Sequence, residues 1–345
     1  MNVIILHPEA PTGAGPLVDA VVEARAILAE RHQKAFHAAG ASGVQVLAGP
    51  PDDLSFGARL RGIARDVPTG AGLIVLGSGA VPLANRRDLA DFVAVAAGPP
   101  GHALANNRFS ADIVAVADAR ATLADLPDLP TDNALPRWLS ETGIVVADLA
   151  RRWRLAVDID TPLDLVLLGA RMARSLSAAD RGRVEQRIAA IRAVATDPRA
   201  ELVVTGRTNP TTLAWLARAT ASRTRALVEE RGLRTSATGQ RPPASILGVA
   251  LDADGPGSLG AHLARLGEAA VVDSRVLLAH RLGADERAWP PAADRFASDL
   301  LLHERVADPW LRDLTRAAAD APIPVLLGGH TLVGPGLRLI LGRRP

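Results

Sequence analysis

Two carboxylates close an apolar segment near the middle of the chain, at a spacing that suits metal binding. Leu155–Ile159 reads as a β-strand, so the side chains of Asp158 and Asp160, two residues apart, are expected on one face. Like charges side by side need a divalent cation, an arginine partner or a raised pKa. We expect Mg²⁺ at Asp158 and Asp160. The alternative is ion pairing with the arginines just upstream, Arg151, Arg152 and Arg154.

A capped helix is predicted directly after these carboxylates. Thr161 is placed to cap it, Pro162 suits its first position, and Asp164 stands where a capping-box acid would. The resulting motif, Asp-Ile-Asp-Thr-Pro followed by Asp-Leu, resembles the late motif of small nucleotidyltransferases with a GT-A-like fold. These include the 2-phospholactate guanylyltransferases and the molybdenum-cofactor guanylyl- and cytidylyltransferases.

The resemblance covers roughly the first half of the chain and implies a function. A nucleotidyl group would pass from a nucleoside triphosphate to a small phosphorylated or acidic acceptor, with Mg²⁺ held by the motif. The loop after the first strand, with Gly13, Ala14 and Gly15, would bind the triphosphate through backbone N–H groups. Arg137 would bind the acceptor. An ordinary strand-to-helix turn, and a capped helix with Trp138 in the core, are the structural alternatives.

Two departures from the family pattern favour a different class, a protein that binds a nucleotide or sugar phosphate without turning it over. The loop His7–Pro16 has no basic residue. Ser78 or Ala80 stands where the family has a second metal-binding Asp after a central strand, and serine supplies no negative charge for Mg²⁺. The segment Asn106–Asp112 either faces a base or sugar or is an asparagine-rich turn.

The second half of the chain carries its own candidate residues. Arg207 follows an apolar strand in a loop of small polar residues, a setting that suits a phosphate or carboxylate ligand. Asp273 and His330 follow two later strands and are expected at the same sheet edge. A third functional class, a hydrolase or lyase, would use a metal site built from Asp299 and His303, read as i and i+4 on a helix, with His280 and His330.

The composition argues against several functions. The 345 residues are 48% hydrophobic and 22% charged, with a formal net charge of +2, as in globular proteins. No apolar run predicts a membrane span, and no basic block with aromatic residues favours nucleic acid. The start, Met1–His7, reads as a strand and not as a signal peptide, so we expect a cytoplasmic protein. Cys is absent and Lys34 is the single lysine, which disfavours thiolate, Schiff-base and P-loop chemistry.

Apolar runs of strand length alternate with helical patterns, which predicts an α/β fold with two Rossmann-like three-layer domains, residues 1–178 and 179–345. The second domain either carries its own site or forms the surface of a homodimer. A polar loop, Thr235–Pro243, is expected to be mobile. The predicted strands are Val3–Leu6, Val44–Ala48, Gly72–Leu76, Ile113–Val116, Leu155–Ile159, Glu201–Val204, Ile246–Leu251, Ala270–Asp273, Pro324–Leu327 and Leu337–Leu341.

Overall fold

The computed structural model describes residues 1–50, 52–231 and 241–342, and it confirms a mixed α/β fold. The chain divides into two compact units, here called unit 1 (residues 1–13 and 22–159) and unit 2 (residues 14–21 and 160–345). Residues 160–178, which the sequence prediction assigned to the first domain, lie in unit 2. Most of the predicted loop Thr235–Pro243 falls outside the described residues.

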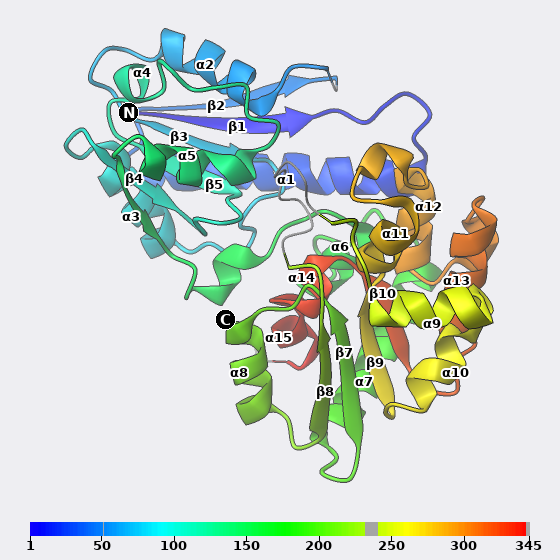
Figure 1. Ribbon diagram of the computed structural model, residues 1–345. Helices are drawn as coiled ribbons and strands as arrows, with labels where there is room; N and C mark the ends of the chain where they lie inside the picture. Colours follow the sequence, from blue (N-terminus) through cyan, green and yellow to red (C-terminus); the bar gives the residue numbers. More distant parts are fainter. Residues whose placement is uncertain (51, 232–240, 343–345) are drawn as a thin grey trace. The chain divides into compact units, whose positions relative to one another are not determined.

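Unit 1 contains a six-stranded mixed sheet with the order β2-β1-β3-β5-β4-β6 (Figure 1). Strand β5 is antiparallel to both its neighbours, β3 and β4, whereas the other pairs are parallel. The first four predicted strands, from Val3–Leu6 to Ile113–Val116, are confirmed as β1, β2, β3 and β5. Strands β4 and β6 were not predicted. The strands are β1 (Asn2–Pro8), β2 (Gly43–Gly49), β3 (Leu73–Gly77), β4 (His102–Ala105), β5 (Ile113–Val116) and β6 (Val145–Asp148).

Helices cover both faces of this sheet because successive strand residues point to opposite sides. Ile74 and Leu76 of β3 join a core with Phe36 of α1 and Phe92 of α3. The residues between them, such as Val75, join a second core on the other face with side chains of α2 and α5. Unit 1 is therefore a three-layer sandwich. Its helices are α1 (Pro16–Ala38, in unit 1 from Val22 on), α2 (Phe56–Asp66), α3 (Arg86–Ala96), α4 (Ala119–Thr122) and α5 (Leu135–Glu141).

The predicted strand Leu155–Ile159 is wrong. Trp153–Ala156 forms a 3-10 helix, η2, and Asp158 makes only an isolated antiparallel bridge with Ala80. The apolar residues of this segment are buried although it forms no strand of the sheet, with Leu155 and Val157 each 1% exposed. Strand alternation therefore cannot be used to place Asp158 and Asp160 on one face.

Unit 2 contains a four-stranded parallel sheet with the order β10-β9-β7-β8. Strands β7, β9 and β10 are buried almost throughout and were predicted from their apolar runs. Strand β8 lies at the edge, is largely exposed and carries Arg223 and Arg225, which explains why it was not predicted. The strands are β7 (Glu201–Gly206), β8 (Arg223–Val228), β9 (Ala269–Asp273) and β10 (Val325–Gly328).

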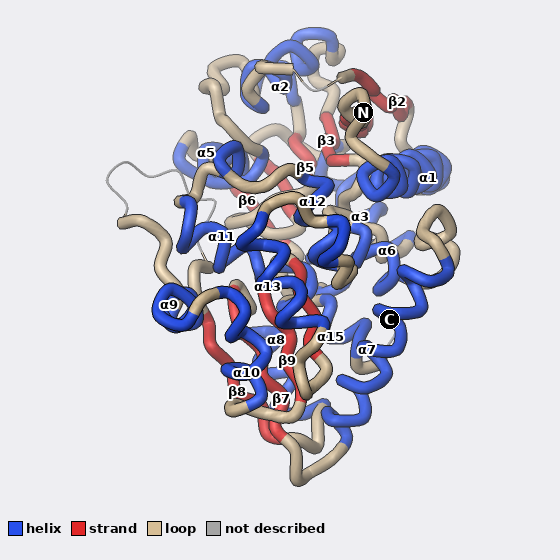
Figure 2. The backbone as a smooth tube through the Cα atoms, turned by 90° about the vertical axis from the view of Figure 1, so that its right-hand side faces the viewer, coloured by secondary structure: helices blue, strands red, loops and turns tan. Residues whose placement is uncertain are grey.

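Several helices pack on the unit 2 sheet. Helix α7 contacts β7, β9 and β10, while α10 contacts β9 and α13 contacts β10; α10 and α13 lie in front of the strands in Figure 2. The helices are α6 (Pro162–Leu168), α7 (Ala178–Thr196), α8 (Pro210–Ala219), α9 (Ile246–Asp254), α10 (Leu259–Ala264), α11 (Ser274–Leu282), α12 (Ala292–Asp299), α13 (Pro309–Ala319), α14 (His330–Val333) and α15 (Gly336–Ile340).

Two predicted strands of unit 2 are helices. The run Ile246–Leu251 belongs to α9, whose start is capped by the Ser245 hydroxyl, which accepts from the Gly248 N–H at 3.1 Å. The run Leu337–Leu341 overlaps α15, where Leu337 and Ile340, three residues apart, are both fully buried. Short apolar runs do not distinguish a strand from a buried helix, which is the physical reason for both errors.

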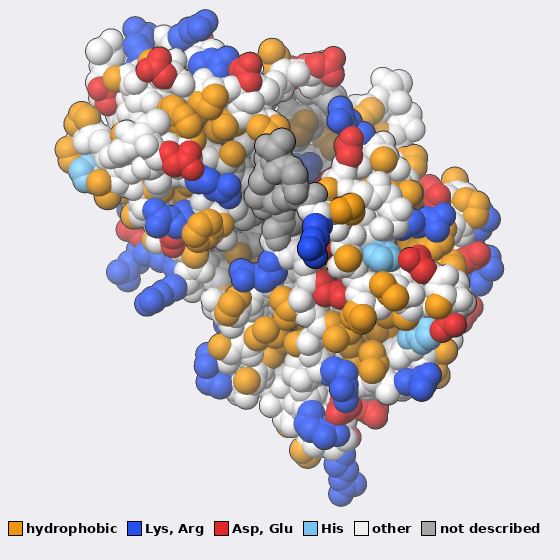
Figure 3. Space-filling view, viewed as in Figure 1, with side chains coloured by type: hydrophobic (Ala, Val, Ile, Leu, Met, Phe, Trp, Pro, Cys, Tyr) orange, Lys and Arg blue, Asp and Glu red, His pale blue; other side chains and the backbone are white. Residues whose placement is uncertain are grey.

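The surface carries charges of both signs. Figure 3 shows blue and red side chains interspersed on the visible face of each unit, and at the start of β8 both Arg223 and Arg225 pair with Glu201. Within the described ranges, no helix is both long enough and apolar enough to cross a bilayer.

Candidate functional site

A pocket of about 180 Å³ lies at the carboxyl ends of β1 and β3 in unit 1. These two strands are parallel neighbours, and the chain leaves β3 through the turn Gly77–Ala80, where the Ser78 N–H donates to the Leu6 carbonyl at 2.8 Å. Ligands of open α/β sheets bind at this kind of edge. The lining residues are Leu6, Pro8, Arg25, Gly77, Ser78, Gly79, Ala80, Asp112, Asp132 and Asp158.

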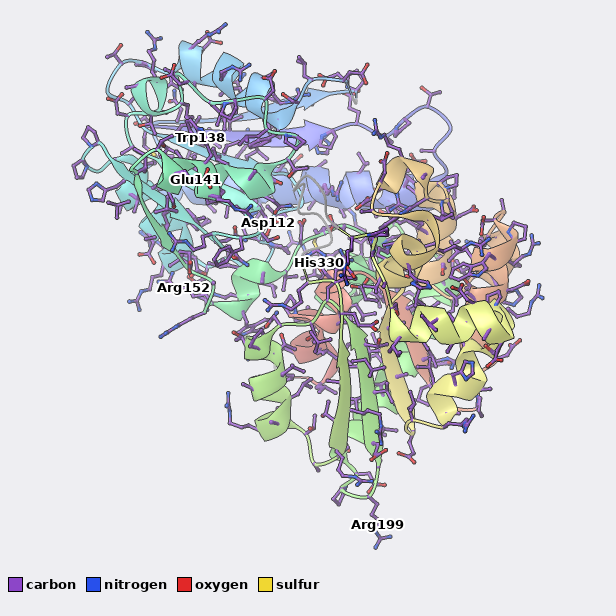
Figure 4. The ribbon with its side chains drawn as sticks, viewed as in Figure 1. Asp112, Trp138, Glu141, Arg152, Arg199 and His330 are labelled. Atoms are coloured by element: carbon purple, nitrogen blue, oxygen red, sulfur yellow. The ribbon has the colours of Figure 1, made fainter. Side chains whose placement is uncertain are left out.

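Asp112 reaches this pocket because β5 runs antiparallel to β3. Ile113 pairs with Leu76, and the Gly77 N–H donates to the Asp112 carbonyl at 3.4 Å, so the residue before β5 lies where β3 ends. The buried amide of Asn106 fixes it: Nδ2 donates to Asp112 Oδ2 at 2.8 Å, and Oδ1 accepts from the Asp112 N–H at 2.9 Å. The side chain of Asn106 thus holds Asp112 in place (Figure 4) and does not face a base or sugar.

Asp158 is held against the turn that ends β3. The Ile159 N–H donates to the Gly79 carbonyl at 3.1 Å and to Asp158 Oδ1 at 2.8 Å. A Cβ at Gly79 would lie 2.8 Å from the Ile159 carbonyl and 3.1 Å from Asp158 Oδ1, so this close approach requires glycine. Asp112 and Asp158, 46 positions apart in sequence, therefore line one pocket.

Helix α1 supports the wall of the pocket with three side chains. Arg25 Nε donates to the Ile159 carbonyl at 2.7 Å, and Arg31 donates to the Pro82 carbonyl. His32 bonds to the Ala80 carbonyl at 2.9 Å, and burial lowers the pKa of His32 to about 4. The ring is therefore neutral near pH 7 and donates from Nε2. The side chains of α1 thus position both segments that carry the pocket residues.

His7 and Ser78 form a second polar pair at the same edge. His7 Nδ1 lies 3.0 Å from Ser78 Oγ, and burial together with the Arg25 charge holds the pKa of His7 below its usual value. His7 is consequently mostly neutral at pH 7, and its tautomer decides whether Nδ1 donates to the Ser78 hydroxyl or accepts from it. From the sequence, Ser78 was identified only as a missing carboxylate, and Asp112 only as the end of a segment that could face a base or sugar. The place of Asp112 beside β3 depends on strand direction, which is not readable from the residues.

Arg152 and Arg154, two of the three arginines that the alternative expected to pair with Asp158 and Asp160, pair with a different carboxylate. Arg152 and Arg154 both bind the carboxylate of Asp88, at 2.9 Å and 2.6 Å, and Asp88 is fully buried in α3. Burial opposes ionisation, but the two guanidiniums and the Asn85 N–H keep the pKa of Asp88 below its usual value. This cluster anchors η2 on α3.

The remaining residues expected from the resemblance are not in the lining of the pocket. Gly13 and Gly15 have φ of +77° and +92°, and the Gly15 carbonyl accepts from the first turn of α1. Gly13 belongs to unit 1, whereas Ala14 and Gly15 belong to unit 2. Arg137 is exposed on α5, and its neighbour Trp138 packs against the second core of unit 1, as the structural alternative predicted (Figure 4). The cap that this alternative included is not formed, since no side chain caps α5.

Asp160 belongs to unit 2 and lies at the start of α6. Asp164 Oδ2 accepts from the N–H groups of Asp160 and Thr161 at 3.0 and 2.8 Å and from the Thr161 hydroxyl at 3.1 Å, so the predicted role of Asp164 at this helix start is confirmed. Burial and the charge of Asp160 raise the pKa of Asp164 to about 7.

Three of the predicted residues of unit 2 do meet at the carboxyl edge of its sheet. Arg207 Nε and Nη2 bind the carboxylate of Asp273 at 2.6 and 3.0 Å. Burial alone would raise the pKa of Asp273. Arg207, with a smaller contribution from the charge of His330, instead keeps this pKa below its usual value. In Figure 4, His330 lies at the opposite end of this sheet from Arg199, which precedes β7.

The His–Asp metal site of the third functional class is not formed. Helix α12 ends at Asp299, so His303 is not its i+4 neighbour, and Asp299 instead binds Arg275. His280 bonds to Asp252 at 3.0 Å and accepts from the Ser245 N–H at 3.2 Å. Among the described residues, no group of three or more His, Asp or Glu side chains is placed to hold a metal ion.

Mg²⁺ requires less than such a cluster. It usually keeps several waters and binds through one or two carboxylates together with substrate phosphates. Asp112 and Asp158 supply two carboxylates in one pocket, with the guanidinium of Arg25 in the same lining. No protein-family model matches the chain, and no curated protein sequence matches it.

Proposed function

We propose that unit 1 is a nucleotidyltransferase-like domain, which binds a nucleoside triphosphate with Mg²⁺ and transfers a nucleotidyl group to a small phosphorylated or acidic acceptor. The observation that carries the proposal is the presence of Asp112 and Asp158 in one pocket. Asp112 supplies the second carboxylate that the turn Gly77–Ala80 lacks. Asp160, which the sequence motif also assigned to the metal, is not among the residues that line the pocket, so in this proposal Asp112 takes its place beside Asp158.

Each pocket residue has a role in the proposed reaction. Asp112 and Asp158 would hold Mg²⁺, which when bound neutralises triphosphate charge and orients the phosphates. Arg25 adds a positive charge at the pocket wall, and its Nε bond to the Ile159 carbonyl fixes its direction. The Ser78 hydroxyl can donate to a phosphate oxygen when His7 Nδ1 carries the ring proton and donates to Ser78 Oγ. The roles of Gly13–Gly15 at the triphosphate and of Arg137 at the acceptor stay predictions.

Thermal unfolding of the full chain with each nucleoside triphosphate, with and without Mg²⁺, tests the proposal. We expect stabilisation that requires Mg²⁺ and is lost in both Asp112→Asn and Asp158→Asn. Asp125→Asn, which changes an exposed carboxylate outside the pocket lining, is the control and should respond as the wild type does. Pyrophosphate release with phosphorylated 2-hydroxy acids as acceptors then tests turnover.

The binding protein without turnover is the second candidate, and the missing basic residue in the loop His7–Pro16 favours it. Nucleotide stabilisation that is independent of Mg²⁺ and unaffected by Asp158→Asn would support that candidate. The absence of any response to nucleotides would refute both.

A further inference from the structure

The carboxyl edge of the unit 2 sheet has the topology of a ligand site. In the order β8-β7-β9-β10, the chain passes from β7 to β8 on one side of β7, and the next strand, β9, lies on the other side of β7. The direction of winding therefore reverses between β7 and β9. Open parallel sheets bind ligands at this switch point. Arg207 directly follows β7, and Asp273 is the last residue of β9, so both lie at this point.

Arg207 is fixed at this point with one edge of its guanidinium still available. Asp273 occupies Nε and Nη2, and it also accepts from the Arg207 backbone N–H at 3.3 Å. The close approach depends on Gly206, since a Cβ there would lie 2.2 Å from Asp273 Cβ. Within the described residues Nη1 has no hydrogen-bond partner. The ion pair therefore orients Arg207 without using all of its donors.

Two buried hydroxyls beside this pair also lack partners. Thr208 follows Arg207 and is 0% exposed; Thr331, on α14, is 3% exposed; neither Oγ1 has a hydrogen-bond partner in the described part of the chain. Helix α14, which follows β10, contacts both β7 and β9, so Thr331 lies at the same sheet edge as Thr208. An unsatisfied buried hydroxyl destabilises a protein by about 1–3 kcal/mol, so two of them need an explanation.

The chemistry of these open groups indicates the ligand. Nη1 of Arg207 only donates, and both hydroxyls can donate. The carboxylate of Asp273 already accepts from Arg207, and that of Asp299 accepts from Arg275. A ligand that satisfies these groups must offer acceptor oxygens. Because Asp273 neutralises the charge of Arg207, a single negative charge suits the edge better than several. The hydroxyls are buried, so the ligand would reach them with a small terminal group.

We propose that the edge formed by Arg207, Thr208 and Thr331 binds the oxyanion of a small ligand, a carboxylate or a phosphate group, at a site separate from the nucleotide pocket of unit 1. The proposal does not depend on the function of unit 1. The proposal retains the prediction that Arg207 binds a phosphate or carboxylate ligand. It adds that Arg207 does so while it is ion-paired with Asp273.

Titration of the full chain with acetate and with inorganic phosphate, followed by calorimetry, tests this site and distinguishes the two oxyanions. The buffer contains EDTA, and its ionic strength is held constant. All proteins carry Asp158→Asn, which prevents Mg²⁺-dependent nucleotide binding by unit 1. We expect saturable binding of at least one probe, weakened at least about tenfold by Thr208→Val or Thr331→Val, the size expected for losing a hydrogen bond to a charged group.

The matched control is Thr315→Val, which removes a hydroxyl that is fully buried but satisfied, by the Leu311 carbonyl and Ser298 Oγ. Without ligand, Thr315→Val should lower Tm and leave oxyanion binding unchanged, whereas Thr208→Val should leave Tm equal or higher. Failure of both probes to bind, or a loss of Tm in Thr208→Val as large as in Thr315→Val, would overturn the proposal. Neither result would bear on Mg²⁺-dependent nucleotide binding by unit 1.

Discussion

The two units end their sheets with different balances of charge. The pocket of unit 1 is lined by three carboxylates and one guanidinium, around a hollow. At the edge of unit 2, Asp273 and Asp299 are each bound by an arginine and fully buried. Charges that are paired and buried fix a structure, whereas an excess of one sign around a hollow attracts a ligand of the other sign. The comparison predicts large stability effects in unit 2 and large ligand effects in unit 1.

Breaking a buried pair of unit 2 should have the largest effect. Arg275→Met removes the partner of Asp299, which is fully buried, and leaves its charge uncompensated. We expect the free energy of unfolding to fall by about 3–5 kcal/mol, measured by urea unfolding.

The control for this change is Arg287→Met. Arg287 pairs with Asp285 at 2.9 Å, but the two side chains are 91% and 57% exposed, so the change should cost less than about 1 kcal/mol. Equal losses in the two variants would contradict the contrast between paired burial and surface pairing.

The stability of unit 2 should also depend on pH through Asp164. Its pKa is about 7 in the folded chain, against an ordinary value of 3.8, because of burial and the Asp160 charge. The folded chain therefore retains a proton that the unfolded chain has released, so stability falls as the pH rises from about 4 to about 7. The slope is at most about 1.4 kcal/mol per pH unit, and it vanishes above the folded pKa.

Asp164→Asn isolates this contribution, because the amide oxygen still accepts while the titration is removed. The difference in unfolding free energy between wild type and variant, measured from pH 5 to 8, should move steadily in favour of the variant until about pH 7. A difference that is constant across this range would show that Asp164 stays ionised.

The sequence predicted the strands that are continuous apolar runs, and failed where direction or context decides. The buried strands β1, β3, β7 and β9 follow from such runs. Strand β8 was missed because an edge strand tolerates Arg223 and Arg225. The run Ile246–Leu251 was misassigned because apolar character alone does not separate a strand from a capped helix.

The candidate site was predicted less completely than the fold. Asp158 was identified from its motif, but its supposed companion Asp160 lies in the other unit and contributes to the raised pKa of Asp164. Asp112 was overlooked because its place depends on β5 running antiparallel to β3, which no local pattern encodes. Arg207, Asp273 and His330 were grouped correctly, since parallel strands bring their carboxyl ends to one edge. Their ion pairing was not foreseen.

Asn106 offers a test of intermediate size, because it is the buried polar support of the unit 1 pocket. Asn106→Leu removes the donor to Asp112 Oδ2 and to the Leu155 carbonyl, both at 2.8 Å. We expect a loss of about 1–3 kcal/mol in urea unfolding, together with a weaker Mg²⁺-dependent response to nucleotide. Asn107→Leu, which removes only an exposed bond to the Phe109 N–H, should do neither. A stability loss with an unchanged nucleotide response would remove Asp112 from the proposed metal site.

The smallest stability effect is expected at Asp158 itself. In Asp158→Asn the amide oxygen can still accept from the Ile159 N–H, so the contact with the turn at Gly79 is retained, and one negative charge leaves an acidic lining. We expect the free energy of unfolding without Mg²⁺ to change by no more than about 0.5 kcal/mol, with a small gain if carboxylate repulsion dominates. Added Mg²⁺ with nucleotide should then stabilise the wild type and not the variant. A loss above about 1 kcal/mol without ligand would mean that Asp158 is a structural partner, as Asp273 is in unit 2, and the contrast between the two sheet edges would no longer hold.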